Sequence, residues 1–455
     1  MKRKHIIKTK YRKIVSDIPH PDSLDLINRL GDLEPDSMHG FMPVIWDKAV
    51  GFQVSDPYGN TWIDFTSAVV LTNSGHANPR IGKALRRQLS SKMWHNYCNP
   101  SERRLEAVRE IKSILPDYLD KVFLLTTGSE AVECALKLAK MHGSVIDPQK
   151  LDIISFYDSF HGRTMGSTLA GGYRQLPAWF GDKGAGYYRI PFPNCARCPW
   201  GREEYDSCGA ECFQRCLKEL TEQKCVFEKV AGILIETFQG PLLDFLPDDF
   251  ALSLEKWARE NNILIIFDEI QAGFGRTGKW FGFEHYNIKP DLVCMGKGMT
   301  SCLPMSAVAG RGRILDIPPH GEMSSTHTGN PLSCAALISN IGSIRDERMI
   351  GNAKELETVA RAALGEIKKK YPDIIGAVMG KGLAWAVYIY KKGTRDFDVK
   401  LAERITTVCM ENGLLMLQTM KGTLKIAPPL CISREAFIEG IGVIEAAVEK
   451  CSVDI

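Results

Sequence analysis

The sequence has no apolar run long enough to cross a bilayer, no internal repeat and no low-complexity segment. A membrane-spanning helix needs about 20 consecutive apolar residues, so no membrane segment is predicted. The net charge of +3 is small for 455 residues, and basic residues are not interleaved with aromatic ones, which argues against nucleic acid as a partner. With 44% hydrophobic and 24% charged residues, the composition is that of an ordinary soluble enzyme.

The N-terminal stretch MKRKHIIKTKYRK is basic but lacks the apolar core of a secretory signal. A transit peptide is the alternative, although such segments are usually richer in Arg and Ser. We expect a mobile basic arm. Most of the 14 cysteines stand singly inside apolar runs, as buried cysteines do in a reducing compartment. The expected compartment is therefore the cytoplasm.

One stretch, PFPNCARCPWGREEYDSCGAECFQRC, holds cysteines close together. Two of its pairs, Cys195 with Cys198 and Cys208 with Cys212, could bind zinc, with Cys216 nearby. The alternative is a Cys-rich excursion between a strand and a helix, with reduced and partly buried thiols. The second pair is spaced by three residues rather than two, so no metal site is assigned.

The chain is too long for one hydrophobic core, so a large domain and a smaller one are expected. Short, almost wholly apolar strands such as VAGILIE and NILIIFDE alternate with helical stretches to about residue 310. This pattern favours an α/β fold with a mainly parallel sheet covered on both faces. After about residue 335 the pattern indicates a smaller α+β domain. The predicted parts are an arm with one helix (1–45), the start of the small domain (46–75), the large domain (76–330) and the rest of the small domain (331–455).

The segment FLLTTGSEAVECALKLAKMHG predicts a strand that ends at Leu125 and a helix that begins near Gly128. Thr127 and Glu130 have the spacing of a capping box. The free N–H groups of Gly128 and Ser129, with the Ser129 hydroxyl, would then form an anion site suited to phosphate. Such a helix start is a weak signal alone, because many capped helices bind nothing.

The segment NILIIFDEIQAGFGRTG places Asp268 at the carboxyl end of a strongly apolar strand. Ligands of open α/β sheets bind beyond these strand ends. A carboxylate there needs a partner, since its desolvation costs several kcal/mol. Asp268 is therefore expected either to face a protonated ring nitrogen or, as the structural alternative, to cap a helix or pair with Arg276.

Lys297 stands between two glycines in DLVCMGKGMTSCLP, after the next apolar strand. A lysine and a carboxylate at neighbouring strand ends, opposite a phosphate-binding helix, is the layout of a pyridoxal phosphate site. A lysine that forms a Schiff base and moves protons needs a lowered pKa and so a buried, partly cationic setting.

At this point the chain resembles the class III aminotransferases, which are fold-type I pyridoxal phosphate enzymes that include 4-aminobutyrate and ornithine aminotransferases. The resemblance covers roughly residues 40–450 and is strongest in LIIFDEIQAGFGRTGKWFGFEHYNIKPDLVCMGKGM. It implies that Lys297 forms the Schiff base with pyridoxal 5'-phosphate and acts as the catalytic acid and base. Asp268 would pair with the ring nitrogen and Gln271 would contact the ring hydroxyl oxygen.

The resemblance also assigns further cofactor contacts. Gly128 and Ser129 match the phosphate loop, and SFHGRTMGS matches the segment whose aromatic residue stacks on the cofactor, here Phe160 followed by His161. From SSTHTGNPLSCAA, Thr326 would reach the phosphate of a neighbouring subunit, which implies a homodimer with two shared sites. The structural alternatives are a core phenylalanine, a hydrogen-bonded histidine and a simple turn residue.

Two departures from the family pattern concern the substrate. In IETFQGPLLDF, Glu236, Gln239 and Gly240 are kept, but Pro241 takes the place of a second glutamate. In GTLKIAPPL, Lys425 replaces an arginine, which in relatives binds the α-carboxylate of glutamate or 2-oxoglutarate and is masked by that glutamate. These changes argue against a standard glutamate-coupled ω-aminotransferase. Lys425 is either open to an anion or faces solvent or a local carbonyl.

By family position, Ser67–Asn73 and Met93–Asn99 should build the pocket entrance, with Val70 and Trp94 as substrate candidates. The predicted function is an aminotransferase that moves an amino group between an amine or ω-amino substrate and an oxo acid by a ping-pong mechanism. The alternative is a racemase or lyase on the same fold. A third possibility, a cofactor-free binding protein, is disfavoured by the intact Lys297, Asp268 and Gln271.

Overall fold

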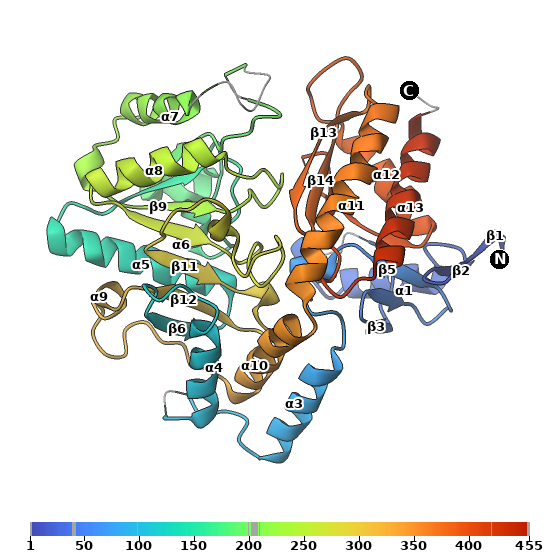
Figure 1. The fold of residues 1–455 in the computed structure, drawn as a ribbon, viewed down its shortest axis with the longest axis horizontal. Helices are drawn as coiled ribbons and strands as arrows, with labels where there is room; N and C mark the ends of the chain where they lie inside the picture. The colour runs from blue at the N-terminus through green and yellow to red at the C-terminus, as the bar shows by residue number, and fades with distance from the viewer. Residues whose placement is uncertain are drawn as a thin grey trace.

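The computed structural model describes residues 2–38, 42–97, 99–198, 200–201, 208, 210–419 and 421–452. Its main sheet has seven strands in the order β6-β12-β11-β10-β9-β7-β8 (Figure 1). Their bounds are β6 Lys121–Leu125, β7 Asp152–Phe156, β8 Tyr187–Ile190, β9 Val230–Glu236, β10 Leu264–Asp268, β11 Leu292–Met295 and β12 Ser306–Gly310. Six of these strands run in the same direction, and β12 is antiparallel to both neighbours. The mainly parallel sheet predicted from the apolar strands is confirmed.

Helices cover both faces of this sheet, and the alternation of side chains along each strand decides which face they meet. In β10, Leu264 and Ile266 belong to the apolar cluster that contains α5 (Gly128–Ile146). Ile265 and Phe267 belong to the opposite cluster, which contains α8 (Asp248–Glu260). Both faces of the strand are therefore buried, as the near-continuous apolar sequence predicts.

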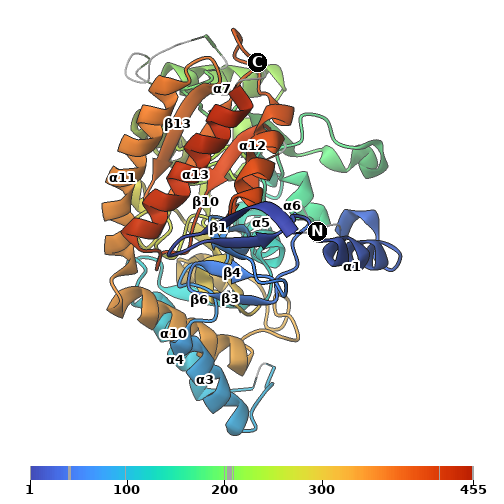
Figure 2. The same cartoon turned by 90° about the vertical axis from the view of Figure 1, so that its right-hand side faces the viewer.

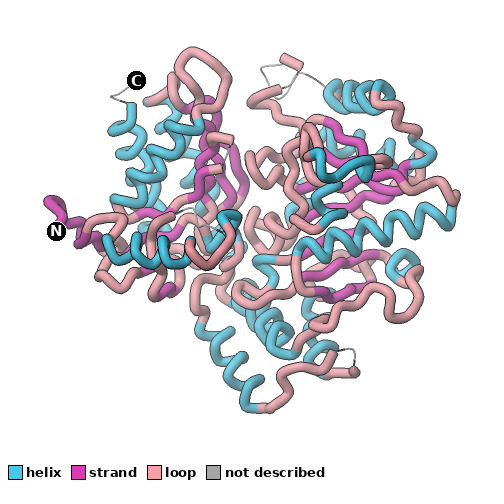
Figure 3. Tube along the Cα trace, turned by 180° about the vertical axis from the view of Figure 1, so that it is seen from behind, coloured by secondary structure: helices cyan, strands magenta, loops and turns pink. Residues whose placement is uncertain are grey.

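A second part of the molecule lies beside the main sheet and consists of the C-terminal segments (Figures 1 and 3). Its four-stranded sheet has the order β13-β14-β17-β16. The strands are β13 Ile375–Lys381, β14 Ala384–Ile389, β16 Leu417–Gln418 and β17 Thr423–Ile426. Its helices are α11 Met349–Lys370, α12 Val399–Glu411 and α13 Arg434–Ser452. Below both parts, α10 (Pro331–Asp346) packs against α3 (Pro79–Ser90) and α4 (Glu102–Lys112).

The N-terminal residues differ from the predicted mobile arm. Two strands, β1 (Lys2–Lys8) and β2 (Lys13–Ser16), form a hairpin that joins β5 (Thr61–Asp64). The sheet continues through β4 (Gln53–Ser55) and β3 (Lys48–Val50), and β15 (Leu414–Leu415) pairs with β5 in parallel. Figure 2 shows the hairpin in front of α13. Arg12 in its turn donates to Glu439 on that helix at 2.6 Å, so this basic segment is held by tertiary contacts.

The helix predicted within residues 1–45 is α1. It spans Pro21–Gly31, because His20 caps the helix and Pro21 occupies its first turn. Further along the chain, β4 and β5 pair around the Asp-Pro-Tyr-Gly-Asn turn. No helix among the described residues has the length and apolar character needed to span a membrane.

A short left-handed turn, α2 (Ser67–Val70), separates β5 from α3. All four residues have positive φ angles between 46° and 65°, although two of them are valines. Left-handed backbone costs about 1–2 kcal/mol per residue that is not glycine, so the turn needs support from elsewhere. Ser67 provides it: its hydroxyl donates to Ala427 O at 2.5 Å and accepts from Arg276.

Candidate active site

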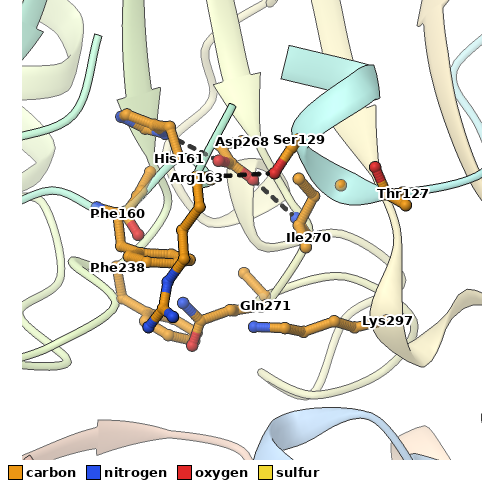
Figure 4. Close-up of a pocket in the computed structure, with 14 residues that line it drawn as sticks. Thr127, Ser129, Phe160, His161, Arg163, Phe238, Asp268, Ile270, Gln271 and Lys297 are labelled. Atoms are coloured by element: carbon orange, nitrogen blue, oxygen red, sulfur yellow. Dashed lines mark hydrogen bonds and ion pairs between the residues drawn. The ribbon is translucent and has the colours of Figure 1, made fainter. Parts of the chain in front are cut away.

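A cavity of about 270 Å³ opens at the carboxyl ends of β9, β10 and β11, where the start of α5 meets the loop that follows β7 (Figure 4). The residues predicted to bind the cofactor meet here, with the exception of Thr326. The lining includes Gly128, Ser129, Phe160, His161, Glu236, Asp268, Gln271 and Lys297. Strand register explains part of this arrangement, since Asp268 on β10 lies beside Glu236 on β9.

The first turn of α5 forms one end of the cavity. Its capping box is present as predicted: Glu130 N donates to Thr127 Oγ1 at 3.2 Å, and Thr127 N donates to Glu130 Oε2 at 2.8 Å. The amides of Gly128 and Ser129 belong to the first turn and have no intrahelical acceptor. The helix begins at Gly128, as predicted, and continues to Ile146.

The loop that carries Phe160 and His161 is fastened to this helix start. Arg163 N donates to Ser129 Oγ at 3.2 Å. Gly162 has a φ of 132°, and a Cβ there would lie 2.3 Å from Ser129 Oγ. Only glycine allows this approach, so the backbone amides of two segments surround the same small space. That space lies at the positive end of a 19-residue helix, where an anion is favoured.

Asp268 is buried and pairs with His161, not with Arg276. Its Oδ2 lies 2.8 Å from His161 Nδ1, and its Oδ1 accepts from Ile270 N at 3.0 Å. Burial lowers the pKa of His161, but the hydrogen bond and the negative charges of Asp268 and Glu236 raise it overall. The structural alternative for Asp268, an ion pair with Arg276, is excluded because that guanidinium contacts Ser67, Asn73 and two carbonyls elsewhere.

Lys297 begins the short turn that follows β11 and extends into the cavity (Figure 4). Its φ is 41°, an unfavourable left-handed conformation for a lysine of the kind that gathers at functional sites. Burial lowers the pKa of Lys297, while the charges of Asp268 and Glu236 oppose that shift. The amine is therefore closer to a usable base than an exposed lysine would be.

Glu236 and Gln271 form the wall between Asp268 and the small sheet. Glu236 accepts from Gly240 N at 2.9 Å and from Phe160 N at 3.3 Å. Burial raises the pKa of Glu236 to about 7. A Cβ at Gly240 would lie 2.5 Å from Gln271 Nε2, so glycine is required there for the Gln271 amide to pack against the loop.

This donor set fits pyridoxal phosphate. The α5 amides and the glycine-lined space around Ser129 suit a phosphate dianion. Asp268 would face the ring nitrogen and Lys297 would face the aldehyde carbon. Gln271 would lie on the side of the ring oxygen, and Phe160 would cover the ring. Each polar group of the cofactor thus gains a partner of the chemistry predicted from the sequence.

The remaining candidates lie outside this cavity. Val70 is buried with 1% exposure, whereas Trp94 is 56% exposed and its ring nitrogen donates to Leu89 O at 2.9 Å. Thr326 is on an exposed loop before α10. Lys425 lies behind Gln271 and bonds it. Their roles toward substrate or a second subunit stay predictions.

Sequence reasoning missed several residues that line the cavity, among them Arg163 and Phe238. Arg163 is exposed, and its guanidinium lies 5.9 Å from the centre of the Phe160 ring. Within the described residues it forms no ion pair with a carboxylate. It stands in SFHGRTMGS, three residues after Phe160. Phe238 follows Glu236 by two residues, a spacing that could have placed it on the same side of the strand end.

The Cys-rich stretch has no metal site in the described part of the chain, where no three His, Cys, Asp or Glu side chains are placed to share an ion. Burial raises the pKa of Cys195 and Cys212 to about 12. Cys198 and Cys208 are partly exposed and Cys216 is buried. The described cysteines therefore fit the alternative of reduced, partly buried thiols.

Comparisons with known proteins show the family of this chain. The family model "Aminotransferase class-III" matches residues 36–448. The chain belongs to the class III aminotransferase family. It is 31% identical to the 4-aminobutyrate aminotransferase of Mycobacterium leprae over 95% of this chain and 97% of the relative. Pyridoxal phosphate is the cofactor of this family, and the fold is that of the fold-type I transferases.

Two further comparisons show that proteins similar to this chain include both racemases and aminotransferases. A leucine/methionine racemase of Thermococcus litoralis is also 31% identical, over 90% of this chain and 91% of the relative. The crystal structure of a Bacillus anthracis aminotransferase matches with a TM-score of 0.83 and 27% identity, over 94% of this chain and 99% of that structure. Fold and family alone therefore do not separate amino transfer from racemisation.

Proposed function

We propose that this class III enzyme transfers an amino group between an ω-amino acid and an oxo acid. The observation that carries the proposal is Arg163, a cation without a carboxylate partner among the described residues, at the edge of the cavity that holds Lys297. The donor therefore carries its amine at one end and its carboxylate at the other. The resemblance to 4-aminobutyrate and 5-aminovalerate aminotransferases supports this substrate class.

The protein groups divide the work of the reaction. Bound pyridoxal phosphate supplies the aldehyde that captures the amine and the electron-withdrawing ring that accepts charge from the reacting carbon. Asp268, which is hydrogen-bonded to His161, would pair with the ring nitrogen and so favour its protonated form. The Nζ atom of Lys297 would take a proton from the substrate carbon and deliver it to the carbon on the other side of the amine nitrogen. Arg163 holds the distal carboxylate, which fixes the substrate in the orientation needed for that transfer.

The test is an absorption titration of the cofactor-loaded enzyme with single donors, without an oxo acid. Candidates are 4-aminobutyrate, 5-aminovalerate and ornithine, compared with an amine of the same length that lacks the carboxylate. A competent ω-amino acid should convert the cofactor band to the pyridoxamine form, and a later addition of oxo acid should restore it. Lys297→Ala should bind the cofactor but not convert it. A wild-type enzyme that converts no amino donor would contradict the proposal.

A racemase is the second candidate function, supported by the similarity to the Thermococcus racemase and by the loss of both members of the arginine–glutamate pair at Pro241 and Lys425. The two functions differ in their products. A racemase interconverts the two enantiomers of an amino acid with no oxo acid present, and its cofactor returns to the starting form in each turnover. Chiral chromatography after incubation with leucine, methionine or alanine alone decides between them.

We also propose that the enzyme is a homodimer in which Thr326 completes the site of the partner subunit. Thr326 is exposed and does not line the cavity of its own chain. The loop after α3 exposes Met93, Trp94 and Tyr97, with 52%, 56% and 40% of their surface accessible. Exposed apolar groups gathered in this way favour a protein interface. Asn330, near Thr326, donates to Trp94 O at 3.1 Å, so this loop and the Thr326 loop lie side by side.

A further inference from the structure

Lys425 connects the two parts of the molecule at the active site. It lies on β17, where it pairs with Ala386 of β14 and Leu417 of β16 in the small sheet. Its Nζ crosses to the large domain and donates to Gly240 O at 3.0 Å and to Gln271 Oε1 at 2.8 Å. The side chain is 5% exposed. This lysine is thus occupied by two acceptors of the protein itself and does not line the cavity.

The charges around Lys425 suit an amine that serves the protein rather than a bound anion. In the described structure no carboxylate lies within ion-pair distance of its Nζ. Lys297 and Arg276 face it with like charge and Glu236 with opposite charge, while both Glu236 oxygens already accept backbone N–H groups. Pro241, in the loop beside it, offers no charge. Even a neutral amine keeps two N–H donors, which match the two acceptors present.

The Gln271 amide is bonded at its oxygen and closely packed at its nitrogen. Its oxygen accepts from Lys425, and its nitrogen packs so closely against Gly240 that a Cβ there would lie 2.5 Å away. In Figure 4 the Lys297 side chain extends toward the Gln271 side chain in the lower part of the cavity. With its oxygen occupied, Gln271 has only N–H groups left to offer to a ligand.

We propose that Lys425 is a positioning residue that fixes the orientation of the Gln271 amide, so that Gln271 presents an N–H donor to the ring oxygen of the cofactor. This inference rests on the proposed cofactor site and differs from the sequence expectation that Lys425 is open to a substrate anion. It also gives the small sheet a direct part in cofactor binding, because Lys425 belongs to that sheet and bonds Gln271.

The experiment compares Lys425→Met, Gln271→Leu and the double variant with wild type, using two readouts other than turnover. The first is the dissociation constant of pyridoxal phosphate, and the second is the pH midpoint of the absorption band of the bound cofactor. We expect each single variant to weaken cofactor binding about three- to tenfold, the effect of one lost hydrogen bond. Both should move the pH midpoint in the same direction. The double variant should lose no more than the larger single loss, because one interaction has been removed twice.

Lys421→Met is the matched control. Lys421 also joins the two parts of the molecule, through Asp158 Oδ1 at 2.8 Å, but it does not contact Gln271. It should leave both readouts unchanged, which separates the orientation of Gln271 from a general loosening of the molecule. Thermal unfolding of every variant checks that it folds. Lys425→Arg, which keeps N–H donors to Gln271, should leave both readouts close to those of wild type, so it tests the inference even where Lys425→Met does not fold.

Two results would overturn the inference. One is strictly additive losses in the double variant. The other is a Lys425 variant with an unchanged pH midpoint whose KM rises for 2-oxoglutarate but not for pyruvate, because this would make Lys425 an anchor for a second carboxylate. Failure of the proposed function is distinguishable from both, since it would be seen in wild type as a cofactor band that no amino donor converts.

Discussion

At the scale of single residues, Arg163 is the side chain on which the choice of substrate depends. Replacing it with methionine keeps a long apolar stem over Phe160 but removes the charge. We expect KM for an ω-amino acid to rise about 10- to 100-fold, the range of a hydrogen bond to a charged group, with a much smaller change in kcat. KM for an amine without a carboxylate should not change. Steady-state kinetics with the two donor types measure this.

Arg174→Met is the control for that prediction, because Arg174 lies in the neighbouring groove and pairs with Asp158 at 3.0 Å. A uniform rise of KM for both donor types in Arg163→Met would contradict the proposed anchor. Lysine at position 163 should recover part of the loss, since it keeps the charge but not the two-pronged geometry of a guanidinium.

Lys425 makes a prediction about pH and stability. Burial, together with the like charge of Lys297, lowers the pKa of Lys425 to about 7. The unfolded chain binds this proton below about pH 10.4, whereas the folded protein does so only below about 7. The stability that Lys425 contributes is therefore complete above pH 10.4 and falls as the pH is lowered toward 7. We subtract the Tm of wild type from the Tm of Lys425→Met, both measured without cofactor. This difference should increase as the pH is lowered from 9.5 to 7. A constant difference would show that Lys425 titrates normally in the folded protein.

For single residues, the sequence predicted which side chains carry the chemistry, but it did not predict which side chains contact one another. Lys297, Asp268 and Ser129 were placed in one site because strand ends and a helix cap are local signals. The partner of Asp268 was not predictable from the residues alone, because His161 lies 107 positions away and reaches it through the loop after β7. Arg163 was missed because a surface arginine has no local signature that separates it from its neighbours.

At the scale of elements, α5 links stability to ligand binding through its cap. Thr127→Val keeps a β-branched side chain but removes the hydroxyl that accepts from Glu130 N, and a lost cap costs about 1 kcal/mol. We expect the variant to lose that stability and also to bind pyridoxal phosphate more weakly, because the amides of the same turn form the anion site. Thermal unfolding and a cofactor titration measure the two effects.

Asp398→Ala is the control that separates the loss of stability from the loss of cofactor affinity. Asp398 caps α12 through Leu401 N at 2.9 Å, outside the cavity. It should destabilise the protein by a similar amount, about 1 kcal/mol, and leave cofactor affinity unchanged. If Thr127→Val also left the affinity unchanged, the start of α5 would not be the phosphate site.

Elements with a strong local pattern were predicted well, and those fixed by distant contacts were not. The strands β9, β10 and β11 follow directly from continuous apolar runs between turn signals. The turn at Ser67–Val70 shows the opposite case: alanine and valine do not favour left-handed backbone, and the contact that supports it joins Ser67 to Ala427, 360 residues away. The N-terminal hairpin was missed for a related reason, because its basic residues resemble a tail until β5 and α13 supply its partners.

At the scale of the whole molecule, the parts of the chain meet at the active site through long-range bonds. Arg276 is fully buried between Ser67, Asn73, Leu383 O and Pro428 O, so one guanidinium connects the N-terminal, central and C-terminal segments. Burial lowers the pKa of Arg276 to about 9, yet four acceptors surround it. The sequence pattern does not predict this buried arginine and its acceptors, because they come together only when distant segments pack.

The dimer makes the last prediction. If Thr326 serves the partner's site, Lys297→Ala and Thr326→Val damage different chains of a shared site. A heterodimer of the two variants then has one site with both defects and one site with none. Unfolding and refolding an equal mixture pairs chains at random, so half of the dimers are mixed and about a quarter of all sites are intact. We expect the mixture to regain about a quarter of wild-type activity, although each variant alone is nearly inactive. If Thr326 instead acts within its own chain, every site of the heterodimer carries one defect and mixing restores nothing.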